Sequence, residues 1–135
     1  METKFKNFLL ERKFFNKLFK INPLKEIVLE FLERENITTE DIIKGVDKYR
    51  EYDIYLALRK ILLENGIESI FREGISYDYA SRTSEKNHFW LECGKWVIDI
   101  FSLFNRNCGE STNIDIFYDN TDEVLYKGEN PIYEF

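Results

Sequence analysis

The sequence is poor in several residue types that mark specialised protein classes. Its 135 residues include one histidine, two cysteines, two prolines and six glycines. So few cysteines, prolines and glycines exclude a disulfide scaffold, a collagen-like chain and a low-complexity chain. A single histidine disfavours a transition-metal centre, so no metal and no cofactor is predicted, although carboxylate-only Mg²⁺ or Ca²⁺ sites stay open.

Long apolar runs are also missing. No stretch approaches the length of a membrane span, and the first residues lack the apolar core and cleavage site of a secretory signal. We therefore expect a cytoplasmic protein in which Cys93 and Cys108 remain thiols, because disulfides persist in oxidising compartments.

Aromatic residues, in contrast, are abundant. Twelve Phe, eight Tyr and two Trp make up 16% of the chain, and hydrophobic residues make up 44%. A chain of this length and composition can bury a full core, so we predict one domain over residues 1–135.

The charge is unevenly distributed along the chain. The net charge is −6, but residues 1–25 carry +5, which leaves −11 on the rest. The acidic remainder argues against nucleic acid as a partner and favours a protein with a basic surface. Acidic residues become frequent toward the end of the chain: Glu110, Asp115, Asp119, Asp122, Glu123, Glu129 and Glu134. Tyr77, Tyr79 and Tyr133 suit a contact surface or a core equally well.

Helical periodicity dominates the first half, about residues 1–66. Apolar residues recur at helical spacing over 1–20 and, more regularly, over 24–32. Thr38 or Thr39, followed by acids, predicts the cap of a short helix, and Asn65-Gly66 predicts the stop of a last one. The basic side of the 1–20 helix is interpreted as a solvated face, in preference to a membrane-binding one.

Strand patterns replace helices over about residues 67–135. Predicted strands cover 67–71, 88–93, 95–101, 114–118 and 123–126, and predicted loops cover 76–87 and 105–113. Helices followed by strands predict an α+β fold in which the N-terminal helices pack on a twisted antiparallel sheet.

Residues 88–100 predict a hairpin that contains the main candidate site residues, His88 and Asp99. A loop at Cys93-Gly94 places His88 directly opposite Asp99, and a loop at Gly94-Lys95 makes the pair diagonal. Both registers leave the two side chains on one face, because side chains alternate along a strand. A carboxylate beside an imidazole can orient it as a general base, or the two can form a buried structural pair.

These residues resemble the transglutaminase-like cysteine peptidase superfamily. The resemblance rests on His88-Phe-Trp-Leu-Glu, a glycine turn and Trp-Val-Ile-Asp99, and extends weakly back to about residue 50. It implies a papain-like core and a nucleophilic cysteine at the start of the preceding helix. The sequence has neither Cys nor Ser there, over 49–53.

Two functions follow from this departure. The first is a non-catalytic protein-binding domain on a degenerate core, for example an immunity-type inhibitor of a basic toxin, because small acidic proteins without catalytic groups include such inhibitors. The alternative is a cysteine hydrolase or acyl transferase with His88 as base, Asp99 as its orienting group and Cys108 as nucleophile. A plain structural or interaction subunit ranks third.

Overall fold

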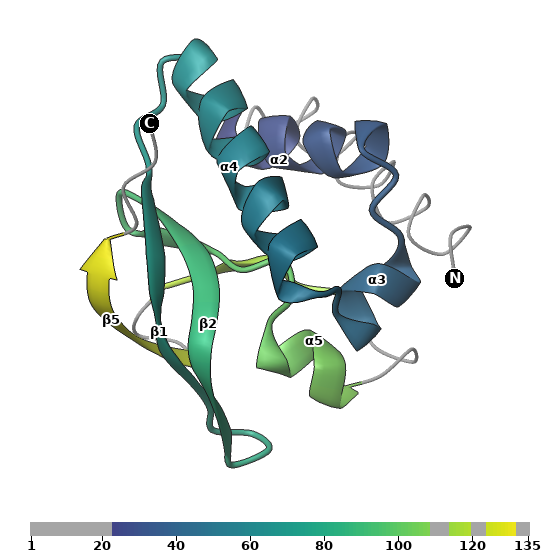
Figure 1. Cartoon of the computed structure of the whole chain (residues 1–135), viewed down its shortest axis with the longest axis vertical. Helices are drawn as coiled ribbons and strands as arrows, with labels where there is room; N and C mark the ends of the chain where they lie inside the picture. Colours follow the sequence, from purple (N-terminus) through teal and green to yellow (C-terminus); the bar gives the residue numbers. More distant parts are fainter. Residues whose placement is uncertain (1–22, 109–113, 120–123, 132–135) are drawn as a thin grey trace.

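A computed structural model of the chain describes residues 23–108, 114–119 and 124–131. These residues form four helices and a five-stranded antiparallel sheet (Figure 1). The predicted α+β class is therefore confirmed. The helix predicted over 1–20 lies outside the described residues.

The helices begin and end where local chemistry predicts. α2 (Pro23–Arg34) begins at a proline, whose fixed φ suits a first helical turn. α3 (Thr39–Lys44) is capped by Thr38, whose side chain and that of Asp41 accept each other's backbone N–H. α4 (Lys48–Glu64) is capped by Asp47 and is followed by Gly66 at φ +75°.

The sheet has the strand order β4-β3-β2-β1-β5, and all its pairs are antiparallel. The strands are β1 (Ile70–Asp78), β2 (Thr83–Cys93), β3 (Trp96–Ile98), β4 (Phe117–Tyr118) and β5 (Val124–Pro131). The first strand begins at residue 70, three residues later than predicted. The strands predicted over 95–101 and 114–118 are shorter in the structure, at 96–98 and 117–118.

Both predicted loops need correction. Residues 76–87 form the end of a long β1–β2 hairpin, because backbone pairing continues through their Ser, Thr and charged residues, from Ser76 opposite Glu85 to Asp78 opposite Thr83. Residues 103–108 form the helix α5 (Leu103–Cys108), whose first turn is capped by the Ser102 side chain on the Asn105 N–H. Residues 109–113 lie outside the described part of the chain.

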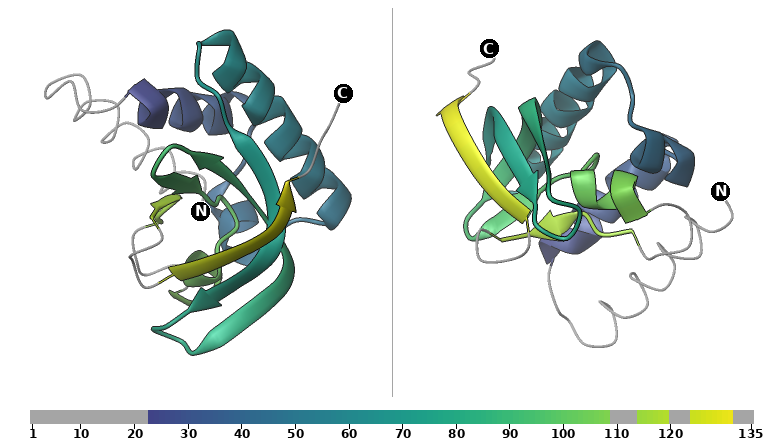
Figure 2. Two further views of the ribbon diagram at one scale, coloured as in Figure 1. Left: turned by 90° about the vertical axis from the view of Figure 1, so that its left-hand side faces the viewer. Right: turned by 90° about the horizontal axis from the view of Figure 1, so that it is seen from below.

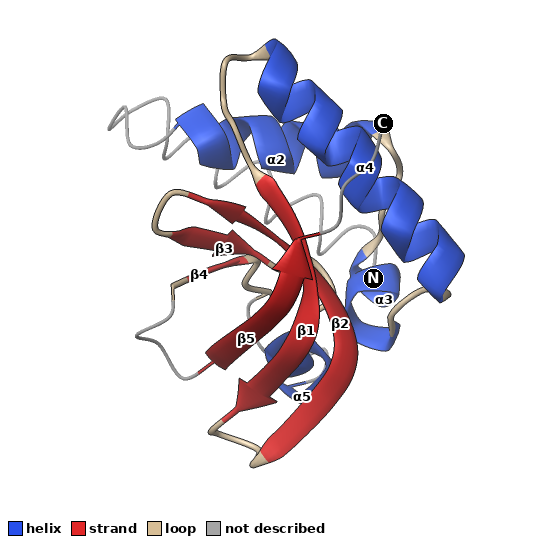
Figure 3. Cartoon of the chain, turned by 60° about the vertical axis from the view of Figure 1, so that its left-hand side comes forward, coloured by secondary structure: helices blue, strands red, loops and turns tan. Residues whose placement is uncertain are grey.

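Side chains of the sheet belong to two different apolar clusters, and α2 and α4 lie along the sheet (Figures 2 and 3). On one face Phe71, Phe89 and Leu91 join side chains of α2 and α4 in the main apolar core. On the other face Trp90, Val97, Tyr118 and Tyr126 form a smaller cluster, against which Phe104 of α5 packs. His88 belongs to this second face, since it lies two residues from Trp90 on the same strand.

No helix among the described residues is both long enough and apolar enough to cross a membrane.

Candidate functional site

A break in strand pairing positions His88. The register between β1 and β2 shifts between Gly74, which lies opposite His88, and Ser76, which lies opposite Glu85. Within this irregularity Asn87 adopts φ +56°, a left-handed conformation that asparagine tolerates. In an unbroken strand Glu85 and His88 would point to opposite faces, but the bulge brings them to one face.

Asp99 is the main partner of His88. The β2–β3 hairpin takes the Gly94-Lys95 loop, with Glu92 opposite Val97, so the structure selects the diagonal arrangement of the two candidates. His88 Nε2 lies 2.9 Å from Oδ1 and 2.8 Å from Oδ2 of Asp99. Both side chains are buried, at 1% and 0% exposure.

Asp99 is also held by other elements. Tyr126 of β5 donates its hydroxyl to Asp99 Oδ2 at 2.8 Å. The Asp99 backbone N–H donates to the Ile116 carbonyl, and the following Ile100 N–H donates to the buried hydroxyl of Tyr55 on α4. His88 and Tyr126 thus bind the buried carboxylate, as a buried charge requires, and the two backbone bonds hold the chain at Asp99 in place.

Glu85 forms a hydrogen bond with the second nitrogen of the imidazole. His88 Nδ1 lies 3.3 Å from Glu85 Oε1, and Arg106 of α5 donates to Oε2 of the same carboxylate. Lys48, at the start of α4, lies 3.5 Å from Glu85 Oε1 and donates to the Asn87 carbonyl at 2.9 Å. The imidazole thus lies between two carboxylates, and two cations flank the outer one.

The pKa values follow from this arrangement. Burial alone would lower the pKa of His88, but the attraction and hydrogen bonds of Asp99 and Glu85 outweigh it and raise that pKa to about 9. Burial would raise the pKa of Glu85, yet the bonds from His88 and Arg106 lower it to about 2. At neutral pH the centre is therefore an imidazolium held between two carboxylates.

Glu51 lies in the first turn of α4, in the stretch where the family resemblance places a nucleophile. It is 5% exposed, and its Oε2 has no hydrogen-bond partner among the described residues. Lys48 Nζ lies 3.8 Å from its Oε1. Burial raises the pKa of Glu51 to about 7, although Lys48 and His88 oppose that rise. A buried carboxyl group that interacts electrostatically with His88 thus lies at the start of α4.

The Cys93 thiol lies apart from this cluster. Cys93 is buried at 6% exposure among the core residues under α2 and α4, on the face of the sheet opposite His88. Burial raises its pKa to about 11. Cys108 closes α5, and its side chain lies outside what the structure describes.

Sequence reasoning found His88 and Asp99 but missed the groups that complete the cluster. The missed residues are Lys48, Glu51, Glu85, Arg106 and Tyr126. Glu51 could have been noticed in the sequence, because it is an acidic residue three positions before Ile54 and so lies on the apolar side of the α4 helix. Glu85 carried none, since its position depends on the bulge.

The described side chains include no group of three or more His, Cys, Asp or Glu arranged to hold a metal ion. Comparison with known proteins assigns no family, because no family model, curated protein or solved structure matches the chain.

Proposed function

We propose that the chain is a non-catalytic protein-binding domain built on a degenerate transglutaminase-like core. One observation carries this proposal: both ring nitrogens of His88 lie against carboxylates, Nε2 against Asp99 and Nδ1 against Glu85. An imidazole that donates through both nitrogens has no lone pair left, so it cannot accept a proton from a thiol or water.

The Cys93 thiol and the helix start support the same proposal. A nucleophile must come within hydrogen-bond reach of its base, but Cys93 lies on the other face with a raised pKa. The first turn of α4 offers the carboxyl group of Glu51 in place of a thiol. The Cys108 side chain, outside the described residues, is left for experiment.

Two measurements on the full chain test the proposal. Nitrogen-15 NMR at pH 7.5 is expected to show both ring nitrogens of His88 protonated. Iodoacetamide at pH 6 is expected to leave the native protein unmodified, while the urea-unfolded protein at higher pH reacts at both cysteines. A neutral His88 together with alkylation in the native state, lost in Cys108→Ser, would instead establish the cysteine hydrolase or acyl transferase.

We further propose that the partner is a basic protein, as in an immunity-type inhibitor. Most of the acidic residues near the chain end lie outside the described side chains, and Asp115 and Asp119 are only partly exposed. The helical layer supplies exposed acids instead, because Glu26, Glu30 and Glu33 follow one face of α2. Such a stripe accelerates association with a positive surface.

Affinity capture from the native organism tests this partner. The wild-type chain is expected to retain one basic protein at low salt, and the triple variant Glu26→Gln, Glu30→Gln, Glu33→Gln is expected to lose it. The control removes two exposed acids of α4, Asp53→Asn and Glu64→Gln, and should retain the protein. Capture of no basic protein, or equal capture by both variants, contradicts the immunity-type proposal.

A further inference from the structure

The β1–β2 hairpin extends beyond the first turn of α4 (Figure 1), and its two faces there differ in burial. Along β1 Ser76 and Asp78 are buried, and Asn107 of α5 lies 3.4 Å from the Asp78 carboxylate. Ile75 and Tyr77 alternate with them, so they point to the other face, and both are only half-buried. Among the described elements, the far end of the hairpin is therefore open on this second side, which we call the open face.

Two tyrosines supply aromatic rings to the open face. The ring centroids of Tyr77 and Tyr79 lie 4.7 Å apart, and the ring planes are 80° apart. Tyr79 is 54% exposed, one of the four large hydrophobic residues that the described part of the chain exposes. The edge-to-face contact holds the Tyr79 ring in place, so a flat aromatic surface is presented to solvent.

Unpaired cations surround the two rings. Lys86 of β2 is exposed and follows Glu85, whose side chain bonds α5, so Lys86 points to the open face. Lys127 of β5 is exposed opposite Ile75, and Arg82 is exposed in the hairpin turn. None of these three cations has a hydrogen-bond or ion-pair partner among the described residues.

Most acids of the hairpin point away from this face. Asp78 and Glu85 lie toward α5, where Asn107 and Arg106 bind them, and Glu73 is a half-buried acid on the open face. The net charge of −6 predicted no nucleic-acid partner. At physiological ionic strength, however, exposed charges more than about 8 Å apart are largely screened from one another. The local excess of cations over Glu73 therefore decides what the open face attracts.

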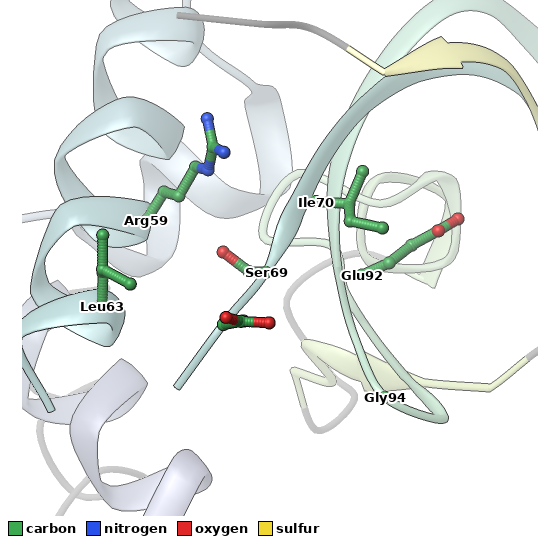
Figure 4. A pocket seen from close by; sticks show the side chains of 7 residues that line it. Arg59, Leu63, Ser69, Ile70, Glu92 and Gly94 are labelled. Carbon is green, nitrogen blue, oxygen red and sulfur yellow. The ribbon is translucent and has the colours of Figure 1, made fainter. Parts of the chain in front are cut away.

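The other end of α4 provides a contrast. A pocket of about 460 Å³ borders it (Figure 4). Its lining includes one cation, Arg59, two acids, Glu68 and Glu92, and no aromatic side chain. This end of the molecule lacks the combination of cations and rings found on the open face, so its cations are suitable for control substitutions.

We propose that the open face of the β1–β2 hairpin binds a single-stranded nucleic acid. A base stacks on the Tyr79 ring, and Lys86 and Lys127 bind phosphates of neighbouring nucleotides. Every base has a flat face, so this stacking requires no particular sequence. An acidic peptide would match the cations but not the exposed ring, and a duplex keeps its bases inside the stack. The site uses none of the acids of α2, so its failure would leave the proposed basic partner unaffected.

Titration of the ¹⁵N-labelled full chain with an oligothymidylate of about 12 nucleotides, a length within the range of such sites, tests the proposal. The amide signals of Tyr79, Lys86 and Lys127 are expected to shift. The duplex with the complementary strand and a polyglutamate of equal length are expected to shift them much less. The proposal is overturned if the oligothymidylate causes no shifts. Equal binding of the duplex or of polyglutamate also overturns it, because the face would then bind polyanions in general or an acidic protein.

Matched variants assign the contacts, and their spectra report whether each is folded. Tyr79→Ala is expected to weaken binding about tenfold through lost stacking, whereas Tyr79→Phe keeps the ring and should bind like the wild type. Lys86→Gln with Lys127→Gln should reduce the slope of log affinity against log salt by about 1.4, since each phosphate contact of a single strand contributes about 0.7. Arg59→Gln with Lys60→Gln removes the same charge from α4 and should leave the slope unchanged. Wild-type affinity in Tyr79→Ala, or equal slopes for the two double variants, contradicts the proposal.

Discussion

The two faces of the sheet are stabilised by different interactions, apolar packing on one and a buried charge cluster on the other. The face under α2 and α4 buries rings such as Phe71 and Phe89, whose centroids lie 5.4 Å apart. The face toward α5 buries His88 and Asp99 beside Trp90 and Tyr126. Apolar burial is insensitive to pH, whereas a buried charge cluster gains or loses stability with every proton it binds. The comparison teaches that similar burial can conceal very different responses to solution conditions.

The largest effects are expected from one truncation on each face. Phe71→Ala should lower the free energy of unfolding by about 3–5 kcal/mol through lost burial and a cavity. Asp99→Ala should cost a similar amount, about 3–5 kcal/mol, because it leaves the buried imidazole without its main partner. Urea denaturation from pH 6 to pH 10 measures both.

The pH dependence distinguishes these two variants. The cost of Asp99→Ala should shrink above pH 9, where His88 is neutral in the wild type, and the cost of Phe71→Ala should stay constant. Equal costs for Asp99→Ala across this range would show that the pair is not ionic.

The next effect is a loss of wild-type stability in base. Since the pKa of His88 is raised from 6.5 to about 9, its contribution is fully present below pH 6.5 and is lost as the pH rises through 9. The loss should be on the order of 3 kcal/mol, at about 1.4 kcal/mol per pKa unit. Thermal or urea unfolding of the wild type and of His88→Gln measures it, and a variant slope as steep as the wild-type slope would contradict the assignment.

A pH effect of the same sign, at lower pH, is expected at Glu51, where the substitution should stabilise the protein. Its pKa is raised from 4.5 to about 7, so folding favours the protonated form and the native state loses stability as the pH rises through this interval. Glu51→Gln removes this cost and should stabilise the protein by about 3 kcal/mol at pH 8, with little change at pH 4.5. Glu64→Gln, at the exposed end of the same helix, is the control and should have no effect at either pH.

Local signals explain how much of the fold could be predicted. The spacing of Ile54, Leu58 and Leu62 predicted the buried stripe of α4, and Asn65-Gly66 predicted its end, because both depend on residues near in sequence. The polar stretch 76–87 gave no apolar alternation, so its strands could not be recognised. They exist because each edge of β1 finds a partner, β2 on one side and β5 on the other.

The candidate site shows the same limit. His88 and Asp99 could be paired from the sequence, because a tight hairpin fixes which residues share a face. Glu85 could not be added, since a bulge at Asn87 reverses the alternation between it and His88. Arg106 and Tyr126 come from distant elements, and only the assembled fold brings them to the cluster.

The smallest effect tests how many bonds the polar face needs. Tyr126→Phe removes one hydrogen bond to Asp99 and keeps the ring against Trp90, where the centroids lie 5.0 Å apart. Because the acceptor is a buried carboxylate, the free energy of unfolding should fall by about 1.5–2 kcal/mol. Tyr77→Phe is the control, since Tyr77 is a half-buried residue whose hydroxyl has no hydrogen-bond partner among the described residues. If Tyr126→Phe is as stable as Tyr77→Phe, the hydroxyl from β5 adds nothing to stability. The His88 imidazolium alone then satisfies the Asp99 carboxylate, and this charge pair stabilises the face without β5.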